Sequence, residues 1–225
     1  VMTQYCQGTG IAVGGTKCAS TASHVGYPTG GALAGVWYDN SVSSPSAATA
    51  HQLAAEAEKA ATHFGNTTTA SNRLVQYFIF SPHGTNPDGY QSNGFCAWHD
   101  YSGDSSMDGG GAVSGPLLAF TNMPYIIDVG ASCGAGFVNP GNNLDGITIV
   151  GGHEYGETIT DQFPAGGWTA NNGEEIGDLC AWKSSGGGRS QNITLSTGSF
   201  AVQGMWSNLA NKGNGGCSVS HSIVT

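Results

Sequence analysis

The segment IVGGHEYGETITDQ, residues 149–162, carries a histidine and carboxylates at a spacing that suits metal binding. On an α-helix, residues four apart lie on the same face, so His153 and Glu157 could bind one ion together. The pattern differs from the zinc-binding helix His-Glu-x-x-His in that Glu157 replaces the second histidine. Zinc accepts carboxylate oxygens as well as imidazole nitrogens, and Glu154 then occupies the position of a general base.

A zinc site of this kind needs a third protein ligand and an open position for water or substrate. The segment 171–180, NNGEEIGDLC, supplies carboxylates 18 and 21 residues after Glu157. We rank Glu175 first and Asp178 second as this third ligand. His99, in FCAWHDYSG, is an outside candidate, either as a ligand or as a donor to the oxyanion that develops during hydrolysis.

Asp161 continues the helix two turns beyond His153 but drifts off its face. We expect it to orient His153 from outside the ligand set, or to bind a second ion. Hard oxygen donors in this region could also hold a structural Ca²⁺, although no EF-hand spacing is present. The acids available for such a site are Asp161, Glu174, Glu175 and Asp178.

The distribution of charge favours a metal over the simpler alternative, a solvated helix that happens to carry charges. Residues 74–182 hold twelve of the fifteen acids and none of the six lysines and arginines. Carboxylates crowded together without cationic side chains repel one another. A bound metal, protonation in acidic surroundings, or simple spacing in water can relieve that repulsion.

The composition is that of one sizeable, loop-rich domain. The chain has 225 residues, 37 of them glycine, and only 9% of its residues are charged. A net charge of −9 argues against nucleic acid as a partner, and no apolar run approaches the roughly 18 residues of a membrane span. Since no basic-then-apolar leader is present, we expect that any signal peptide has been removed.

Six cysteines and no CxxC pair predict disulfides of a secreted protein rather than a zinc knuckle. Buried free thiols in a cytosolic protein are the alternative. Fifteen pairings are possible, and we favour the one that closes the shorter loops. It joins Cys6 to Cys18, Cys96 to Cys133 and Cys180 to Cys217.

The elements expected to position these residues are two long helices and several strands. Residues 44–65 predict a helix that begins at Ser-Pro-Ser and stops at Gly65. Residues 35–40 and 73–82 predict strands, the second of them central, and residues 115–130 predict a strand or pair broken at Pro124.

The motif itself should lie on the second long helix, residues 144–161, capped by Asn143 or Asp145. Its three interior glycines suggest close packing against another backbone; they are Gly151, Gly152 and Gly156. Irregular strand should follow over 192–208. The expected fold class is α+β: a single domain, residues 1–225, with a mixed sheet, two main helices, long Gly-rich loops and three disulfides.

The wider pattern resembles a group of secreted bacterial and fungal proteins that is similar to the plant Exordium-like proteins. The residues that carry the likeness are HEYGETITDQ, GGWTANNGEEIGDLCAW, CAWH and MPYIIDVGASC, and it covers most of 75–185. The resemblance implies a zincin-like metalloprotease. Departing from the family pattern, Gln162 stands where a proline is common, which leaves the end of the helix undetermined.

Members of that group have a further N-terminal portion with an apolar strand, whereas this chain begins at Val1. Two explanations stay open: a processed form that has lost a propeptide, or a strand supplied by a separate fragment.

Two other functions remain as alternatives. A metal-independent acid peptidase could use a carboxyl pair drawn from Glu154, Glu157 and Glu175. A non-catalytic cell-wall or carbohydrate-binding protein could present tryptophans as stacking platforms, although tryptophans beside cysteines more often pack in a core. Those tryptophans are Trp98, Trp168 and Trp182.

The function we expect is that of a secreted, monomeric zinc metalloprotease acting on protein or peptide substrates. Zn²⁺ would be held by His153, Glu157 and a downstream carboxylate, and Glu154 would activate the attacking water. We expect neither nucleic acid nor a membrane as a partner.

Overall fold

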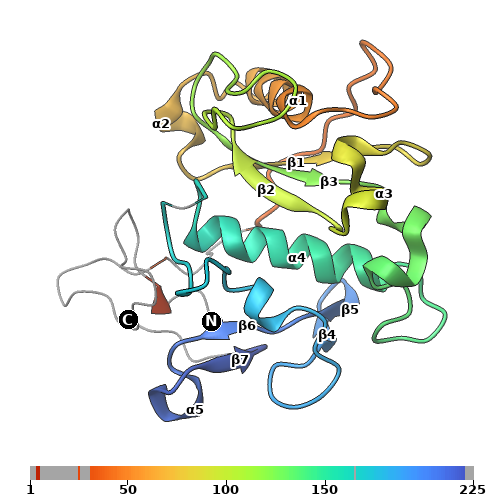
Figure 1. Ribbon diagram of the computed structural model, residues 1–225, viewed down its shortest axis with the longest axis vertical. Coiled ribbons are helices and arrows are strands. Elements are labelled where there is room, and N and C mark those ends of the chain that lie inside the picture. Colours follow the sequence, from red (N-terminus) through yellow and green to blue (C-terminus); the bar gives the residue numbers. More distant parts are fainter. Residues whose placement is uncertain (1–3, 6–24, 26–30, 165, 221–225) are drawn as a thin grey trace. The chain divides into compact units, whose positions relative to one another are not determined.

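The computed structural model describes residues 4–5, 25, 31–164 and 166–220, and it divides into two compact units. Pro28–Asp128 form one, called the sheet unit here. The other, called the helix unit, contains the chain from Val129 onward together with the described residues before position 26. Figure 1 labels the elements of both.

The sheet unit contains a three-stranded mixed sheet. β3 (Ala119–Met123) lies between β1 (Gln76–Phe80), its parallel neighbour, and β2 (Trp98–Tyr101), its antiparallel neighbour. All five residues of β3 are buried. The strand expected within 73–82 is therefore confirmed, but its central place was wrong: among the described residues β1 is an edge strand of this sheet, and Phe80 is 65% exposed.

Helix α1 (Ala50–His63) packs on this sheet through a face made mostly of alanine. Small side chains let a helix approach β-strands closely, and Leu53, Tyr77 and Phe120 complete the core between them. The predicted helix is confirmed, but it begins at Ala50, with Thr49 as its N-cap residue, rather than at Ser-Pro-Ser. Thr49 and Gln52 form a capping box that satisfies the first free amides.

The remaining elements of this unit are short. They are α2 (Thr69–Asn72), η2 (Pro87–Gly89), α3 (Tyr90–Asn93) and the start of η3 (Ile126–Cys133), a 3₁₀ helix that leads into the helix unit. A second strand after Pro124 was one option, and η3 stands there instead.

The strand predicted for residues 35–40 was wrong. That segment pairs with no strand in the described residues, and Val36 and Tyr38 are 65% and 80% exposed. Its β-type composition cannot form a ladder without a neighbouring strand.

Helix α4 (Asp145–Thr160) confirms the second predicted helix, but not its cap. Leu144 is the N-cap residue, and no side chain caps the helix. The carboxylate of Asp145 instead accepts four hydrogen bonds from the preceding loop, from Val138, Asn139 and Asn142.

Two of the three interior glycines of α4, Gly151 and Gly152, differ from the expectation of close packing. A Cβ on Gly151 or Gly152 would meet nothing within 4 Å among the described residues. The close approach of backbones occurs at Gly146 instead, where a Cβ would lie 2.0 Å from the carbonyl oxygen of Cys133.

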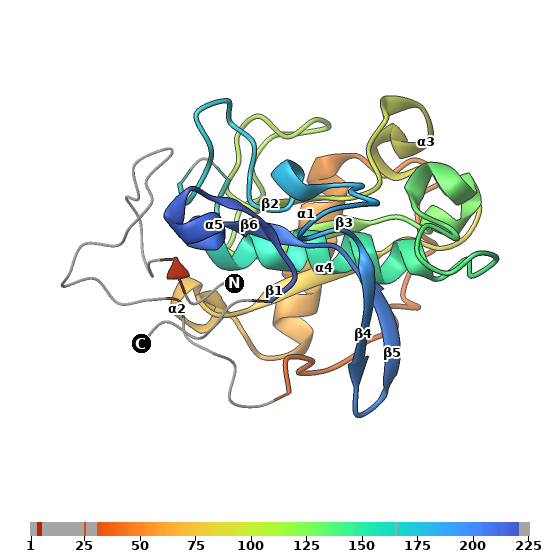
Figure 2. The ribbon, with the colours of Figure 1, turned by 90° about the horizontal axis from the view of Figure 1, so that it is seen from below.

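The C-terminal strands form two antiparallel pairs rather than irregular strand. β4 (Gln191–Leu195) pairs with β5 (Gly198–Val202), and β6 (Met205–Ser207) with β7 (Gly216–Ser218) after the short α5 (Ala210–Gly213). Helix α4 packs on β5, and Thr148 Oγ1 donates to the carbonyl of Ala201 at 2.6 Å. Figure 2 shows the β4–β5 hairpin reaching away from α4.

A second hydrophobic cluster joins Tyr5, Trp168, Ile176 and Met205 in the helix unit. Trp168 is only 2% exposed and packs edge-on against Tyr5, so it cannot act as a stacking platform. Trp182 keeps 39% of its surface exposed and contacts Phe137. Trp98 packs against the other core and donates to Asp88.

Two disulfides, not three, are seen in the described residues. The predicted Cys180–Cys217 bond is confirmed, and Cys96 and Cys133 are disulfide-bonded as well. The predicted Cys6–Cys18 bond lies outside the described residues. The Cys180–Cys217 bond fastens η4 (Asp178–Cys180) to β7, which fixes the segment that supplies candidate ligands.

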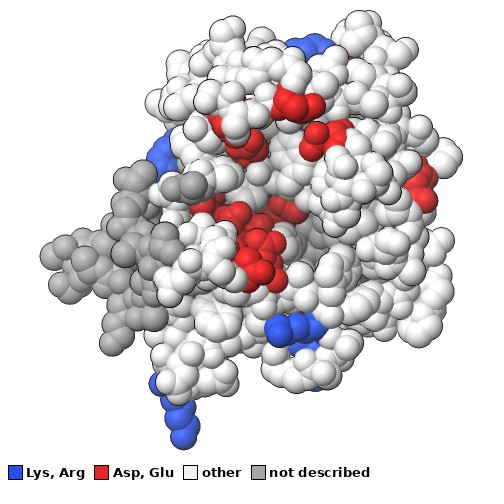
Figure 3. Space-filling model, viewed as in Figure 1, with Lys and Arg blue, Asp and Glu red and all other residues white. Residues whose placement is uncertain are grey.

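Among the described helices, none is long and apolar enough to cross a membrane. Acidic atoms reach the surface in several groups on the face drawn in Figure 3, where basic atoms are fewer.

Candidate metal centre

The spacing on α4 brings His153 and Glu157 together as expected. The Nε2 atom of His153 lies 3.1 Å from Oε2 of Glu157. The two side chains point to the same side of the helix because they are one turn apart.

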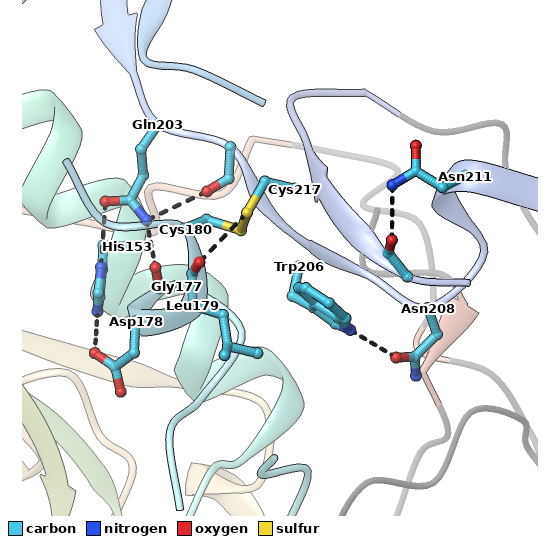
Figure 4. The surroundings of a disulfide bond; sticks show 12 residues. His153, Gly177, Asp178, Leu179, Cys180, Gln203, Trp206, Asn208, Asn211 and Cys217 are labelled. Atoms are coloured by element: carbon cyan, nitrogen blue, oxygen red, sulfur yellow. Dashed lines mark hydrogen bonds and ion pairs between the residues drawn. A yellow bond between two sulfur atoms is a disulfide. The ribbon is translucent and has the colours of Figure 1, made fainter. Parts of the chain in front are cut away.

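Asp178, at the start of η4, is the third member of this group. Its Oδ1 atom lies 3.4 Å from the same Nε2 of His153. Figure 4 marks this ion pair with a dashed line. The candidate ligand atoms of His153, Glu157 and Asp178 all lie within 4.8 Å of one another. One imidazole and two carboxylates at this separation form a set that could hold a metal ion.

Glu175, ranked first from the sequence, does not belong to this group. Its backbone amide donates to Oδ2 of Asp178 at 3.1 Å, which leaves Oδ1 of Asp178 turned toward His153. The geometry therefore favours Asp178, the second-ranked residue, as the third ligand.

Glu157 is oriented by the backbone of the η4 segment. Its Oε1 atom accepts hydrogen bonds from the amides of Gly177 and Asp178 at 2.9 and 3.0 Å. The carboxylate is only 3% exposed, so these donors replace the water that it loses on burial. With Oε1 engaged in this way, Oε2 is the oxygen presented to His153.

Gly177 is required where it is because no side chain fits there. A Cβ would lie 2.8 Å from Oε1 of Glu157 and 2.9 Å from Cγ and Nδ1 of His153. Because residue 177 is glycine, the backbone that leads into η4 can pass directly beside both candidate ligands.

The second nitrogen of His153 is held by Gln203, a residue that the sequence analysis missed. Nδ1 lies 3.3 Å from Oε1 of Gln203, which is 6% exposed and lies between β5 and β6. The sequence offers one signal for this residue, a glutamine inside the apolar stretch SFAVQGMW. Nothing in that stretch indicates that the glutamine lies beside His153.

The electrostatics of the group favour a cation. Burial lowers the pKa of His153, but the hydrogen bonds to Asp178 and Glu157 and the charges of Glu157 and Glu154 outweigh it and raise that pKa well above its ordinary value. The same carboxylates would attract a divalent cation, which competes with protons for these oxygens and this nitrogen.

The group is buried on one side and open on the other. The side chain of Asp178 is 44% exposed, whereas those of His153 and Glu157 are 14% and 3% exposed. An ion or a substrate atom would therefore approach past Asp178.

The other candidate residues are not members of the group formed by His153, Glu157 and Asp178. Glu154 is buried in α4 at 4% exposure, and His99 lies on β2 of the sheet unit, opposite Thr121 and 8% exposed. Asp161 caps the end of α4, and its Oδ1 accepts from the amide of Gly166 at 3.3 Å. Because Asp161 turns toward that loop, it does not join the three-residue group.

The four acids considered for a calcium site form no common group among the described residues. Asp161 and Glu174 join no group with Asp178 in the described residues, and Glu174 accepts instead from the side chain of Asn172 at 2.7 Å.

Comparisons with protein-family models, with curated proteins and with solved structures found no match to this chain. The function must therefore be argued from the site itself.

Proposed function

We propose that this protein is a secreted zinc metallopeptidase whose metal is held by His153, Glu157 and Asp178. The observation that carries the proposal is the orientation of all three side chains toward one point. Glu157 is held by two backbone amides, Asp178 by the amide of Glu175, and His153 by Gln203. Such outer partners are typical of metal sites, because they fix each ligand before the ion binds.

The donor set fits zinc. Zinc binds imidazole nitrogen and carboxylate oxygen, and a catalytic zinc has three protein ligands and one open position. The exposed side of Asp178 leaves room for that position. When bound, zinc polarises a peptide carbonyl and makes a coordinated water a better nucleophile.

The remaining steps are assigned to the side chains of the chain. Glu154 follows His153 directly on α4 and would accept a proton from the attacking water. It would then pass this proton to the leaving amine, so that one carboxylate serves as base and acid in turn.

Secretion is part of the proposal. Disulfides persist in oxidising compartments and are rare in reducing ones, so the bonded cysteines favour an extracellular site of action.

The test measures zinc content and cleavage of an unfolded protein substrate on the same preparation. We expect about one zinc per chain, loss of cleavage with 1,10-phenanthroline and recovery when zinc is added back. Glu154→Gln should retain the zinc and lose about 100-fold or more in turnover. Glu174→Gln, an exposed acid outside the group, is the matched control and should behave like the wild type.

Two results would count against the proposal. Cleavage that survives the chelator would indicate an acid peptidase with a carboxyl pair. A protein that binds no zinc at neutral pH would remove the metal centre altogether.

A further inference from the structure

Trp182, in the helix unit, is a bulky residue on a left-handed stretch of backbone. Its φ angle is +54°, a region that residues with large side chains rarely adopt. Such a conformation costs free energy and persists only where the surrounding structure holds it. The indole nevertheless keeps 39% of its surface exposed, so burial alone does not account for a tryptophan at this position.

Two features of the structure hold Trp182 in place. Two residues before it, Cys180 forms the disulfide bond to Cys217 that Figure 4 draws. Gly134 packs against the ring so closely that a Cβ there would stand 2.7 Å from Cζ3 of the indole. The partly exposed ring therefore stands on a fixed support.

This support lies against the same face of α4 that carries two of the candidate ligands. A Cβ on Gly134 would also lie 3.1 Å from Cα of Gly146, in the first turn of α4. Residues seven apart lie on nearly the same side of an α-helix, so Gly146 is in line with His153. Two turns separate these residues, which is about 10 Å along the helix axis.

The turn η4 also keeps Trp182 near the third candidate ligand. The amide of Ala181 donates to the carbonyl of Asp178 at 3.1 Å. Because consecutive Cα atoms are about 3.8 Å apart, the Cα of Trp182 lies within roughly 9 Å of that carbonyl oxygen. The indole thus belongs to the same region of the helix unit as the candidate metal centre.

Phe137 supplies a second ring beside Trp182. The ring centroids are 5.4 Å apart, and the ring planes meet at 75°. We propose that these two rings form an apolar subsite that holds an aromatic or large aliphatic side chain of the peptide substrate. The proposal rests on the metal centre of the proposed function and adds to it a preference for the sequence of the substrate.

The separation between the rings and the candidate ligands suits an extended peptide. Residues of an extended chain advance about 3.3 Å each, so a side chain three residues from the cleaved bond lies roughly 10 Å away from it. An apolar side chain gains free energy when the two rings remove it from water. We therefore expect cleavage about three residues from the apolar side chain.

The shape of the subsite favours a side chain over a sugar. A sugar ring stacks flat on one aromatic face, whereas two rings at 75° form a corner. A compact apolar group can contact both rings of a corner at once. The segments that carry the rings, residues 131–137 and 180–182, contain no charged residue, which also suits an apolar occupant.

The test uses ten-residue peptides in which one phenylalanine occupies each position in turn, with serine in its place as the reference. Mass spectrometry of the products locates the cleaved bond, and kcat/KM measures the preference on the zinc-loaded protein. Fluorescence anisotropy measures the dissociation constant of each labelled peptide on chelator-treated protein, where no turnover occurs. Cellohexaose is titrated into the same samples as a probe for polysaccharide.

The variants separate substrate binding from a structural role. Trp182→Gly removes the indole and suits the left-handed backbone, and Trp182→Phe keeps an aromatic ring. Leu195→Ala is the matched control, because Leu195 on β4 is also an exposed apolar residue of the helix unit, at 54%. If Trp182→Gly does not fold, Phe137→Ala replaces it, because that change removes the other ring.

We expect the wild type to prefer phenylalanine about tenfold in kcat/KM and in affinity, at one position near the third residue from the cleaved bond. Leu195→Ala should keep this preference, Trp182→Phe should keep most of it, and Trp182→Gly should lose it.

Three outcomes would overturn the inference. One is a Trp182→Gly protein that melts at a lower temperature but keeps the preference, which would make Trp182 a packing residue only. Another is an equal loss in Leu195→Ala. The third is binding of cellohexaose that depends on Trp182 without any preference among peptides. A wild type that binds no zinc would defeat the proposed function instead, and the affinities on chelator-treated protein would still decide whether Trp182 holds an apolar side chain.

Discussion

Gly177 passes so close to His153 that a methyl group on its Cα would stand 2.9 Å from the imidazole ring. It would stand equally close to Glu157, at 2.8 Å from Oε1. Contacts this short force either the ring or the carboxylate to move. One backbone position thus controls two of the three candidate ligands.

We predict that Gly177→Ala weakens zinc binding about tenfold or more, because the ligands lose their common orientation. Competition with a chromophoric chelator measures the affinity. Gly187→Ala is the control, since the nearest described atom to a Cβ there, the carbonyl oxygen of Cys217, is at 3.8 Å. Wild-type affinity in Gly177→Ala would show that the group is not the metal site.

The choice between two acids for the third ligand can be made directly. Asp178→Asn keeps the volume of the side chain but removes the charge, and we expect it to lower zinc affinity by about 100-fold, beyond most losses from outer partners. Glu175→Gln should leave the affinity little changed, because its side chain lies outside the three-residue group. Isothermal titration calorimetry measures both. The reverse order of effects would restore Glu175 as the ligand.

Asp100 should make stability depend on pH. Burial raises the pKa of Asp100 to about 6 in the folded protein, from 3.8. The folded state therefore binds this proton more tightly, so stability falls as the pH rises from about 4 to 6 and the loss is complete above that range. Two units correspond to about 3 kcal/mol, and partial exposure of the carboxylate reduces this.

Asp100→Asn should remove this dependence, because the amide is neutral at every pH and its oxygen can still accept from the amide of Tyr101. Urea unfolding at pH 4 and pH 7 gives the comparison. We expect the variant to gain stability over the wild type at pH 7 and not at pH 4; a gain of equal size at both would contradict the assignment.

Two glycines of α4 should respond in opposite ways to alanine. Gly152→Ala should stabilise the fold by about 0.5–1 kcal/mol, since the added methyl group meets no described atom and alanine favours the helix. Gly146→Ala should destabilise it, because its Cβ would overlap the carbonyl of Cys133. Chemical denaturation measures the free energy of unfolding of both variants. A destabilised Gly152→Ala would contradict the prediction, because it would mean that other atoms pack on the face of α4 that carries Gly152.

The Cys180–Cys217 bond should support the metal site as well as the fold. We expect the double variant Cys180→Ser/Cys217→Ser to lose roughly 2–4 kcal/mol of unfolding free energy. Cys180 lies two residues after Asp178, so zinc affinity should fall too. Melting curves recorded with a chelator measure the loss of stability alone, because no zinc is then bound. An unchanged zinc affinity would show that Ile176 and its neighbours hold the segment unaided.

The parts of the site that depend on local geometry could be predicted from the sequence. His153 and Glu157 meet because a helix brings residues four apart together, whatever surrounds it. Asp178 could not be ranked above Glu175 in this way. Its position depends on the buried Ile176, on the hydrogen bond from the amide of Trp206 to the carbonyl of Ile176, and on a disulfide to β7.

The same distinction applies to the fold. The capping box and alanine face of α1 are local signals, and the helix was found. The central strand of the sheet was misplaced because β1 and β3 are both apolar, and pairing rather than composition decides which lies inside. Gln203 was missed for a similar reason: its partner is fifty residues away in sequence.

That separation along the chain has a consequence for how the protein is made. Helix α4 leaves the ribosome with two prospective ligands, but fifty more residues must be added after His153 before Gln203 exists. Cys217, which anchors the Asp178 segment, arrives later still. A growing chain would therefore carry the HExxE signature long before it could retain an ion, because the residues that hold His153 and the Asp178 segment are added later.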